Sequence, residues 1–175
     1  NWEMIIIDDA SPDNSNEIIG AYCKQDSRIK LLKMGGNSGP ANARNKGIKN
    51  SKGRYISFLD SDDTWFPEKL EKQVKFMQEN NLYITCSSYY TIDEDGNSIN
   101  TRIVKKSFSY VDLLKSNQIG NLTGIYDSSK LGKLYMKNVD HEDYVLWLEI
   151  MEKVGNTKAI IEPLAEYRIL NDSLS

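Results

Sequence analysis

Two apolar runs that each end in aspartates constrain the fold of this 175-residue chain more than any other feature. The first is "MIIIDD", residues 4–9, and the second is "YISFLDSDD", residues 55–63. Runs that are apolar on both faces are typical of strands buried in a parallel sheet. Such sheets bind their ligands at the carboxyl ends of the strands. Both acidic clusters fall at such ends, and we therefore expect them to share one crevice.

Strands and helices alternate through the first half of the chain. The hydrophobic pattern and the turn residues predict strands over residues 4–7, 29–34, 55–59 and 83–90, and helices over 15–25, over 40–49 and from 67. "DEDGN", residues 93–97, is typical of a hairpin turn. This alternation predicts a right-handed parallel α/β sheet. The strands that follow Glu3, Arg28 and Gly53 should then be parallel in one sheet, with Asp9 and Asp60 at the same edge.

The pattern changes after about residue 106. Irregular stretches rich in Ser, Asn and Gly surround a short predicted helix over 110–116. "HEDYVLWLEIMEKVG", residues 141–155, has apolar residues at helical spacing and predicts an amphipathic helix. Two short strands should follow, over 158–161 and 165–168.

Composition excludes some classes of function. The net charge is -3, whereas a general nucleic-acid binder needs a basic surface to neutralise phosphates. No apolar run approaches the roughly 20 residues that a membrane span requires. The expectation from these features is a cytoplasmic protein of unknown oligomeric state, with peripheral association at the inner face of a membrane left open.

The "DSDD" cluster poses an electrostatic problem. Asp60, Asp62 and Asp63 lie within four positions, and such close like charges need compensation. A divalent cation would supply it, because Mg²⁺ and Mn²⁺ prefer carboxylate oxygens together with substrate phosphates. The alternative is a solvated acidic turn at the start of the next helix, where aspartates are favourable for ordinary dipole reasons.

The other motifs are ambiguous when each is taken alone. "IIIDDAS" fits a strand-to-helix turn as well as a contact to a nucleobase or ribose. Arg44, in "NSGPANARNKG", is either a ligand-binding side chain or a solvated helix charge. Glu142 and Asp143 suit the first turn of any helix. His141 is the only histidine, so neither a catalytic triad nor a histidine-based metal cage can be assembled.

In series, however, "IIIDDASPDNS", "NSGPANARNKGI", "GRYISFLDSDD" and "HEDYVLWLEI" closely resemble the family 2 glycosyltransferases over nearly the whole chain. This resemblance implies the GT-A fold, a Rossmann-like, mainly parallel sheet flanked by helices. It also implies that residues 1–106 form the half that binds a nucleotide-sugar and residues 107–175 the acceptor-side half of the same domain.

The resemblance assigns a role to each matching donor-side residue. Asp8 and Asp9 match the pair that contacts the nucleotide base, commonly uracil, and Arg44 matches an arginine beside the nucleotide. Asp60-Ser61-Asp62 matches the DxD motif, whose first carboxylate lies near the ribose and whose last binds the metal, Mn²⁺ or Mg²⁺. The implied donor is a nucleotide-diphospho-sugar, most commonly UDP-linked.

Asp143 matches the general base of the family, which deprotonates the acceptor hydroxyl. The implied reaction is an inverting sugar transfer to a glycan or lipid-linked acceptor, usually in bacterial surface polysaccharide assembly. A single displacement needs no covalent nucleophile, but the pKa of the base should be raised above its ordinary value to make it effective.

Two departures from the family pattern leave alternatives open. The first strand of the family would lie upstream of Asn1, so we expect the native protein to continue there. Leu170 occupies a position that is often histidine before a Ser-x-Ser segment, here residues 173–175, which puts a third protein ligand to the metal in doubt.

A non-catalytic nucleotide-sugar-binding relic is one alternative function. A haloacid-dehalogenase-like phosphatase, with Asp60 as the nucleophile of "FLDSDDTW", is another.

Overall fold

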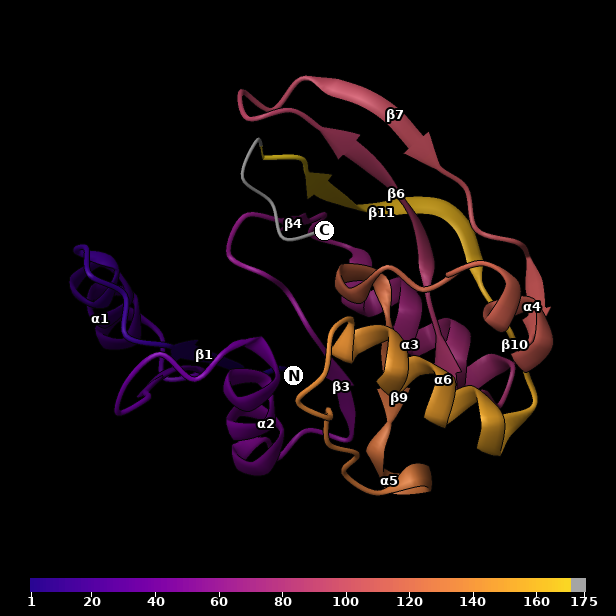
Figure 1. The fold of residues 1–175 in the computed structure, drawn as a ribbon, viewed down its shortest axis with the longest axis horizontal. Helices are drawn as coiled ribbons and strands as arrows, with labels where there is room; N and C mark the ends of the chain where they lie inside the picture. The colour runs from indigo at the N-terminus through magenta and orange to yellow at the C-terminus, as the bar shows by residue number, and fades with distance from the viewer. Residues whose placement is uncertain (171–175) are drawn as a thin grey trace.

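The computed structural model describes residues 1–170, and Figure 1 shows how their elements are arranged. The longer helices are α1 (Ser15–Gln25), α2 (Pro40–Asn50), α3 (Lys69–Glu79) and α6 (Glu142–Val154), and the short ones are α4 (Tyr110–Lys115), α5 (Ser128–Leu131) and the 3-10 turn η1 (Asn121–Thr123). The strands are β1 (Met4–Asp8), β2 (Ile29–Lys33), β3 (Tyr55–Ser57), β4 (Thr64–Trp65), β5 (Ile84–Thr85), β6 (Ser87–Ile92), β7 (Ser98–Arg102), β8 (Ser107–Ser109), β9 (Ile125–Asp127), β10 (Asn156–Lys158) and β11 (Ile160–Arg168).

β1 and β2 form a parallel pair, with Met4 opposite Ile29 and Asp8 opposite Lys33. β1 lies with α1 and α2 at the left of Figure 1. α2 packs on this pair, because a Cβ added at Gly47 would lie 3.6 Å from the Ile7 side chain. The predicted strands and helices of this unit are confirmed to within a residue at each end.

The expectation that the third strand joins the same sheet is wrong. β3 pairs antiparallel with β9, and β5 pairs antiparallel with the other edge of β9. Within residues 1–170, β1 hydrogen-bonds to β2 alone, so no ladder connects β1 to β3. Asp9 and Asp60 therefore follow strands of different sheets. The pairing that was not foreseen is with β9, a three-residue strand without a periodic pattern, which takes one hydrogen-bonding edge of β3, and no ladder within residues 1–170 forms on the other edge.

A third sheet has the strand order β4-β11-β6-β7. β11 runs parallel to β6, and the predicted hairpin joins β6 to β7 with Gly96 in the left-handed region at φ 87°. The two strands predicted over 158–161 and 165–168 are instead β10 and the long β11. The register of β11 shifts on both sides of Pro163, because proline cannot donate to the ladder.

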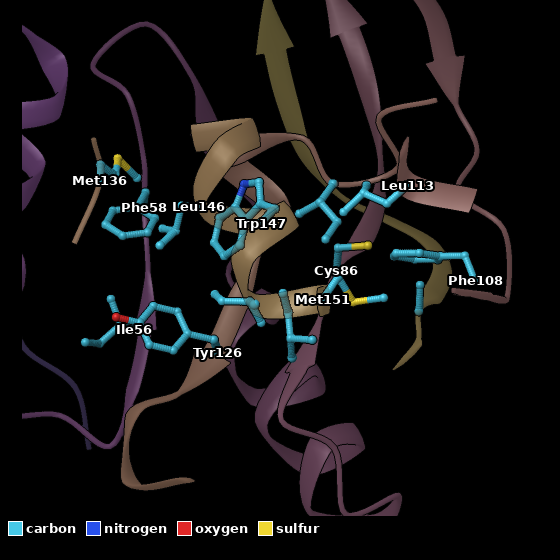
Figure 2. Packing of buried hydrophobic residues seen from close by; sticks show 14 of the residues in the cluster. Ile56, Phe58, Cys86, Phe108, Leu113, Tyr126, Met136, Leu146, Trp147 and Met151 are labelled. Carbon is cyan, nitrogen blue, oxygen red and sulfur yellow. The ribbon is translucent and has the colours of Figure 1, made fainter. Parts of the chain in front are cut away.

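Trp147 lies at the centre of the hydrophobic cluster in Figure 2 and is fully buried. Its ring contacts Phe58, which follows β3, at a centroid distance of 6.0 Å. A Cβ at Gly124 would lie 2.6 Å from the Trp147 ring, so only glycine fits there. This packing holds α6 against the residue that follows β3. In the part of the chain that is described, no helix is long and apolar enough to cross a membrane.

Candidate functional site

The carboxylate of Asp60 is held on both oxygens. Arg44 of α2 donates to Oδ1 at 2.6 Å, and the side-chain amide of Asn121 donates to Oδ2 at 3.3 Å. The Asp60 side chain is still 38% exposed, so it remains accessible to a ligand. Two elements that are distant in sequence thus orient the first carboxylate of the DxD segment.

Arg44 also donates to Glu142, the first residue of α6. Its side chain is only 17% exposed, and its guanidinium pairs with both the Asp60 and the Glu142 carboxylates. Burial opposes the charge of Arg44, but the charges of Asp60 and Glu142 outweigh burial and raise its pKa above the ordinary value. Arg44 therefore joins α2, the loop after β3 and the start of α6 in one cluster.

Asp143, the next residue along α6, is half-buried beside this cluster. Burial raises its pKa above the ordinary value, and the nearby charges of Glu142 and Asp60 act in the same direction. The backbone amide of Tyr144 and the charge of Arg44 oppose the shift without cancelling it. A raised pKa makes a carboxylate a stronger proton acceptor.

His141 precedes α6 in a left-handed conformation, at φ 55° and ψ 45°. Such a conformation is uncommon for a residue other than glycine, and backbone outliers often cluster at functional sites. The turn at His141 starts α6 where Glu142 can reach Arg44.

Asp62 and Asp63 differ in their surroundings. Among the described residues, the Asp62 carboxylate has no hydrogen bond or ion pair. Asp63 is buried and accepts a hydrogen bond from the backbone amide of Arg168 at 3.0 Å. Burial raises the pKa of Asp63 to about 7. The Arg168 side chain donates to the carbonyls of Asp62, Asp93 and Glu94, which fastens this loop to the β6–β7 hairpin.

A divalent cation fits this loop only with help from the substrate. No group of three His, Cys, Asp or Glu side chains within residues 1–170 converges as a metal cage. Leu170 offers no ligand atom. The free Asp62 carboxylate nevertheless suits Mg²⁺ or Mn²⁺, which proteins often hold with one or two carboxylates while phosphates and water complete the shell.

Asp8 and Asp9 hold the loop after β1. Asp8 is buried and accepts hydrogen bonds from the Ser11 amide and the Asn16 side chain, which lower its pKa. Asp9 accepts from the backbone amides of Ser38 and Gly39, immediately before α2. In the described structure no hydrogen bond or ion pair joins either aspartate to the cluster around Arg44.

Three residues of the site were not singled out from the sequence: Asn121, Glu142 as the partner of Arg44, and Arg168. Asn121 lies in an irregular polar stretch, which carries no periodic signal. The pairing of Arg44 with Glu142 spans 98 positions, so no local pattern could predict it. A cavity of about 300 Å³ lies elsewhere, between residues 80–83 and 154–158, and contains none of the acidic site residues.

The family model described as "Glycosyl transferase family 2" matches residues 1–142. The chain therefore belongs to the family 2 glycosyltransferases, and the expected α/β fold of the GT-A type is confirmed. This membership argues against the phosphatase alternative.

Two bacterial relatives match the full chain. TuaG of Bacillus subtilis, which carries the name of a teichuronic acid biosynthesis glycosyltransferase, is 40% identical, and the chain spans 70% of its length. WfgD of Escherichia coli, a UDP-Glc:alpha-D-GlcNAc-diphosphoundecaprenol beta-1,3-glucosyltransferase, is 39% identical, and the chain spans 68% of its length.

Solved structures of similar fold are more distant in sequence. TarS of S. aureus in complex with UDP-GlcNAc superposes with a TM-score of 0.79 over 98% of this chain, at 18% identity. The mannosyltransferase PcManGT of Pyrobaculum calidifontis in complex with GDP-Man and Mn²⁺ gives a TM-score of 0.67 at 14% identity. The chain spans about half of each of these structures, 50% and 49%. These likenesses concern the fold.

Proposed function

We propose that the protein is an inverting glycosyltransferase that moves a sugar from a UDP-linked nucleotide-diphospho-sugar to a hydroxyl of a glycan or lipid-linked acceptor. The observation that carries the proposal is the Arg44 bridge, because it brings the DxD carboxylate Asp60 and the start of α6 into one cluster. The UDP-Glc donor and lipid-linked acceptor named for WfgD support the choice of substrates.

In this proposal residues 1–106 supply most of the donor side and residues 107–175 the acceptor side. Asp8 and Asp9 would contact the base, Arg44 the nucleotide, and Asp60 the ribose. A lipid-linked acceptor, like that named for WfgD, would bring the protein to the inner face of the membrane. Bacterial surface polysaccharide is the proposed product class, and the teichuronic acid biosynthesis in the name of TuaG supports it.

Asp143 is the proposed general base. The acceptor oxygen attacks the anomeric carbon while the bond from that carbon to the diphosphate oxygen breaks, and the leaving electron pair departs with the nucleotide. The acceptor proton passes to the Asp143 carboxylate. The raised pKa of Asp143 supports this role, and Glu142 is less suitable because its carboxylate is engaged by Arg44.

Asp62 is the proposed protein ligand for Mn²⁺ or Mg²⁺. When bound, the cation would neutralise the charge of the departing diphosphate. The free carboxylate of Asp62 can turn toward the diphosphate, whereas the buried Asp63 is occupied by the Arg168 amide.

The test is turnover of a panel of UDP- and GDP-linked sugars with Mn²⁺ and polyprenyl-diphosphate-linked or soluble sugar acceptors, together with calorimetry of UDP and GDP binding. Release of nucleotide and inversion at the anomeric carbon are expected for one donor class. Binding of a nucleotide-sugar without turnover under any acceptor condition would favour the non-catalytic alternative. Absence of nucleotide binding would refute both.

A further inference from the structure

Three side chains from three different elements hold three consecutive backbone carbonyls at and just after η1. The hydrogen bonds run from Trp65 to Leu122 (2.7 Å), from Gln73 to Thr123 (2.8 Å) and from Ser57 to Gly124 (2.5 Å). The donors belong to β4, α3 and β3. An irregular segment with three successive carbonyls fixed in this way has little freedom to move, because buried carbonyls that lose their donors carry a substantial penalty.

Lys69 connects the three donors. Its side chain is fully buried, and its ammonium donates to Gln73 at 2.7 Å and to Ser57 at 3.4 Å. The same ammonium lies 4.0 Å from the centre of the Trp65 ring. A buried cation is costly unless it is well partnered. We conclude that these four side chains form one polar cluster beneath η1.

Asn121, the first residue of η1, connects this anchored segment to Asp60 of the site. It is only 9% exposed, and its amide donates to Oδ2 of Asp60 while Arg44 holds Oδ1. The side-chain oxygen of Asn121 is buried and has no hydrogen-bond partner within the described residues. The backbone anchor and the bond to Asp60 are therefore what fix the orientation of this amide.

We infer that Asn121 is a positioning residue that orients the Asp60 carboxylate toward the ribose of the donor and so sharpens selectivity for ribonucleotides. The inference rests on the proposed function, in which Asp60 faces the ribose. A carboxylate fixed at both oxygens accepts hydroxyl hydrogens in one geometry only. Without Asn121, the Asp60 carboxylate is held by Arg44 alone and can rotate about that contact. A nucleotide with a ribose should then lose more binding affinity than one with a deoxyribose.

The test compares UDP with 2′-deoxy-UDP and 3′-deoxy-UDP by calorimetry, with Mn²⁺ and the full chain, for the unaltered protein and for Asn121→Ala. The unaltered protein should prefer UDP over at least one analogue. Asn121→Ala should weaken UDP binding roughly three- to tenfold, the effect of one hydrogen bond to an oriented group. It should leave binding of the poorer analogue within about twofold.

Asn117→Ala is the matched control, since it removes an exposed carboxamide from the same loop without touching Asp60. Asn121→Ser, too short to reach Asp60 but still polar, should repeat the loss of selectivity if Asn121→Ala folds poorly. Gln73→Met removes the bond to the Thr123 carbonyl and should cause a smaller loss of selectivity for UDP over the analogues. Equal weakening of all three nucleotides, or no weakening, would overturn the inference alone. Failure of the unaltered protein to bind UDP would overturn the proposed function and the inference with it.

Discussion

Replacing Lys69 by methionine tests the energetics of the polar cluster beneath η1. Burial lowers the pKa of Lys69 from 10.5 to about 7. Between about pH 7 and 10.5 the unfolded chain therefore holds a proton that the folded protein lacks, so this group makes stability rise with pH. Below about pH 7 both states hold the proton, and the cost of burying the charge is complete.

Methionine has a similar length and no charge, so the variant lacks this pH dependence. From pH 7 to pH 8.5, the unfolding free energy of the unaltered protein should therefore rise by about 1.5 kcal/mol relative to that of Lys69→Met. The absolute difference at pH 7 also contains the lost bonds to Gln73 and Ser57, each about 1 kcal/mol. The pH dependence of the difference is therefore the sharper measure.

The assay is urea unfolding followed by circular dichroism at pH 7, 7.5, 8 and 8.5. Burial also raises the pKa of the Cys86 thiol, and ending the series at pH 8.5 limits its contribution. Lys75→Met is the matched control, because Lys75 lies on the exposed side of the same helix, with its side chain 74% exposed. A difference that stays constant with pH for Lys69→Met would refute the reasoning, because it would mean that Lys69 remains protonated throughout.

Four further predictions concern the site and its support. Asp62→Ala should abolish most of the dependence of UDP binding on Mn²⁺, measured by calorimetry with and without a chelator. Asp143→Asn keeps the size of the side chain but cannot accept a proton, so transfer should fall about 100-fold or more while UDP affinity stays nearly unchanged. In the unaltered enzyme, transfer should decline toward acid pH through a pKa above the ordinary aspartate value, because the base must be ionised. Gly124→Ala should destabilise the protein by about 1–3 kcal/mol in denaturant unfolding, since its Cβ would lie 2.6 Å from the Trp147 ring.

Each of these variants has a control in the chain. Asp95→Ala removes an exposed carboxylate from the β6–β7 turn and should leave Mn²⁺ dependence intact. Glu149→Gln alters a surface residue of α6 paired with Lys137 and should retain transfer. Gly20→Ala, with open space around its Cβ, should not destabilise α1. Equal UDP affinity with and without Mn²⁺ in the unaltered protein would contradict the metal role. Undiminished transfer by Asp143→Asn would contradict the base.

Local patterns were sufficient for β1, α1, β2 and α2, whereas the single strand predicted over 83–90 is two strands, β5 and β6, in different sheets, and β4 was not predicted. The turn residues before it predicted α1 over about 15–25, which are its observed ends, and Pro40 after Gly39 marked the start of α2. The pairing of the strands could not be predicted in the same way, because β3 pairs with β9, about 70 positions away in the sequence. β9 is three residues long, "IYD", and its strand conformation depends on the backbone of β3 and β5 rather than on its own pattern.

The acidic residues of the site were easier to select from the sequence than their partners. Asp60 and Asp143 stand at the ends of recognisable elements, and family motifs mark both. Asn121 and Glu142 act through contacts that span 61 and 98 positions. Such contacts depend on how α2, η1 and α6 pack together, which no single segment encodes.

The positive charge of Arg44 compensates part of the repulsion between the clustered carboxylates of the site. Asp60 and Glu142 share its guanidinium, and the same charge tempers the raised pKa of Asp143. Asp63 is bound instead by the backbone amide of Arg168, and burial raises its pKa to about 7. Asp62 has no counter-charge among the described residues. In the proposed function, Asp62, which is half-exposed and has no counter-charge within residues 1–170, is therefore the carboxylate suited to a cation. Asp143, whose pKa is raised at the start of α6, is the carboxylate suited to accept a proton. In this proposal, the surroundings of each aspartate decide whether it binds the ribose, binds the cation or accepts the proton.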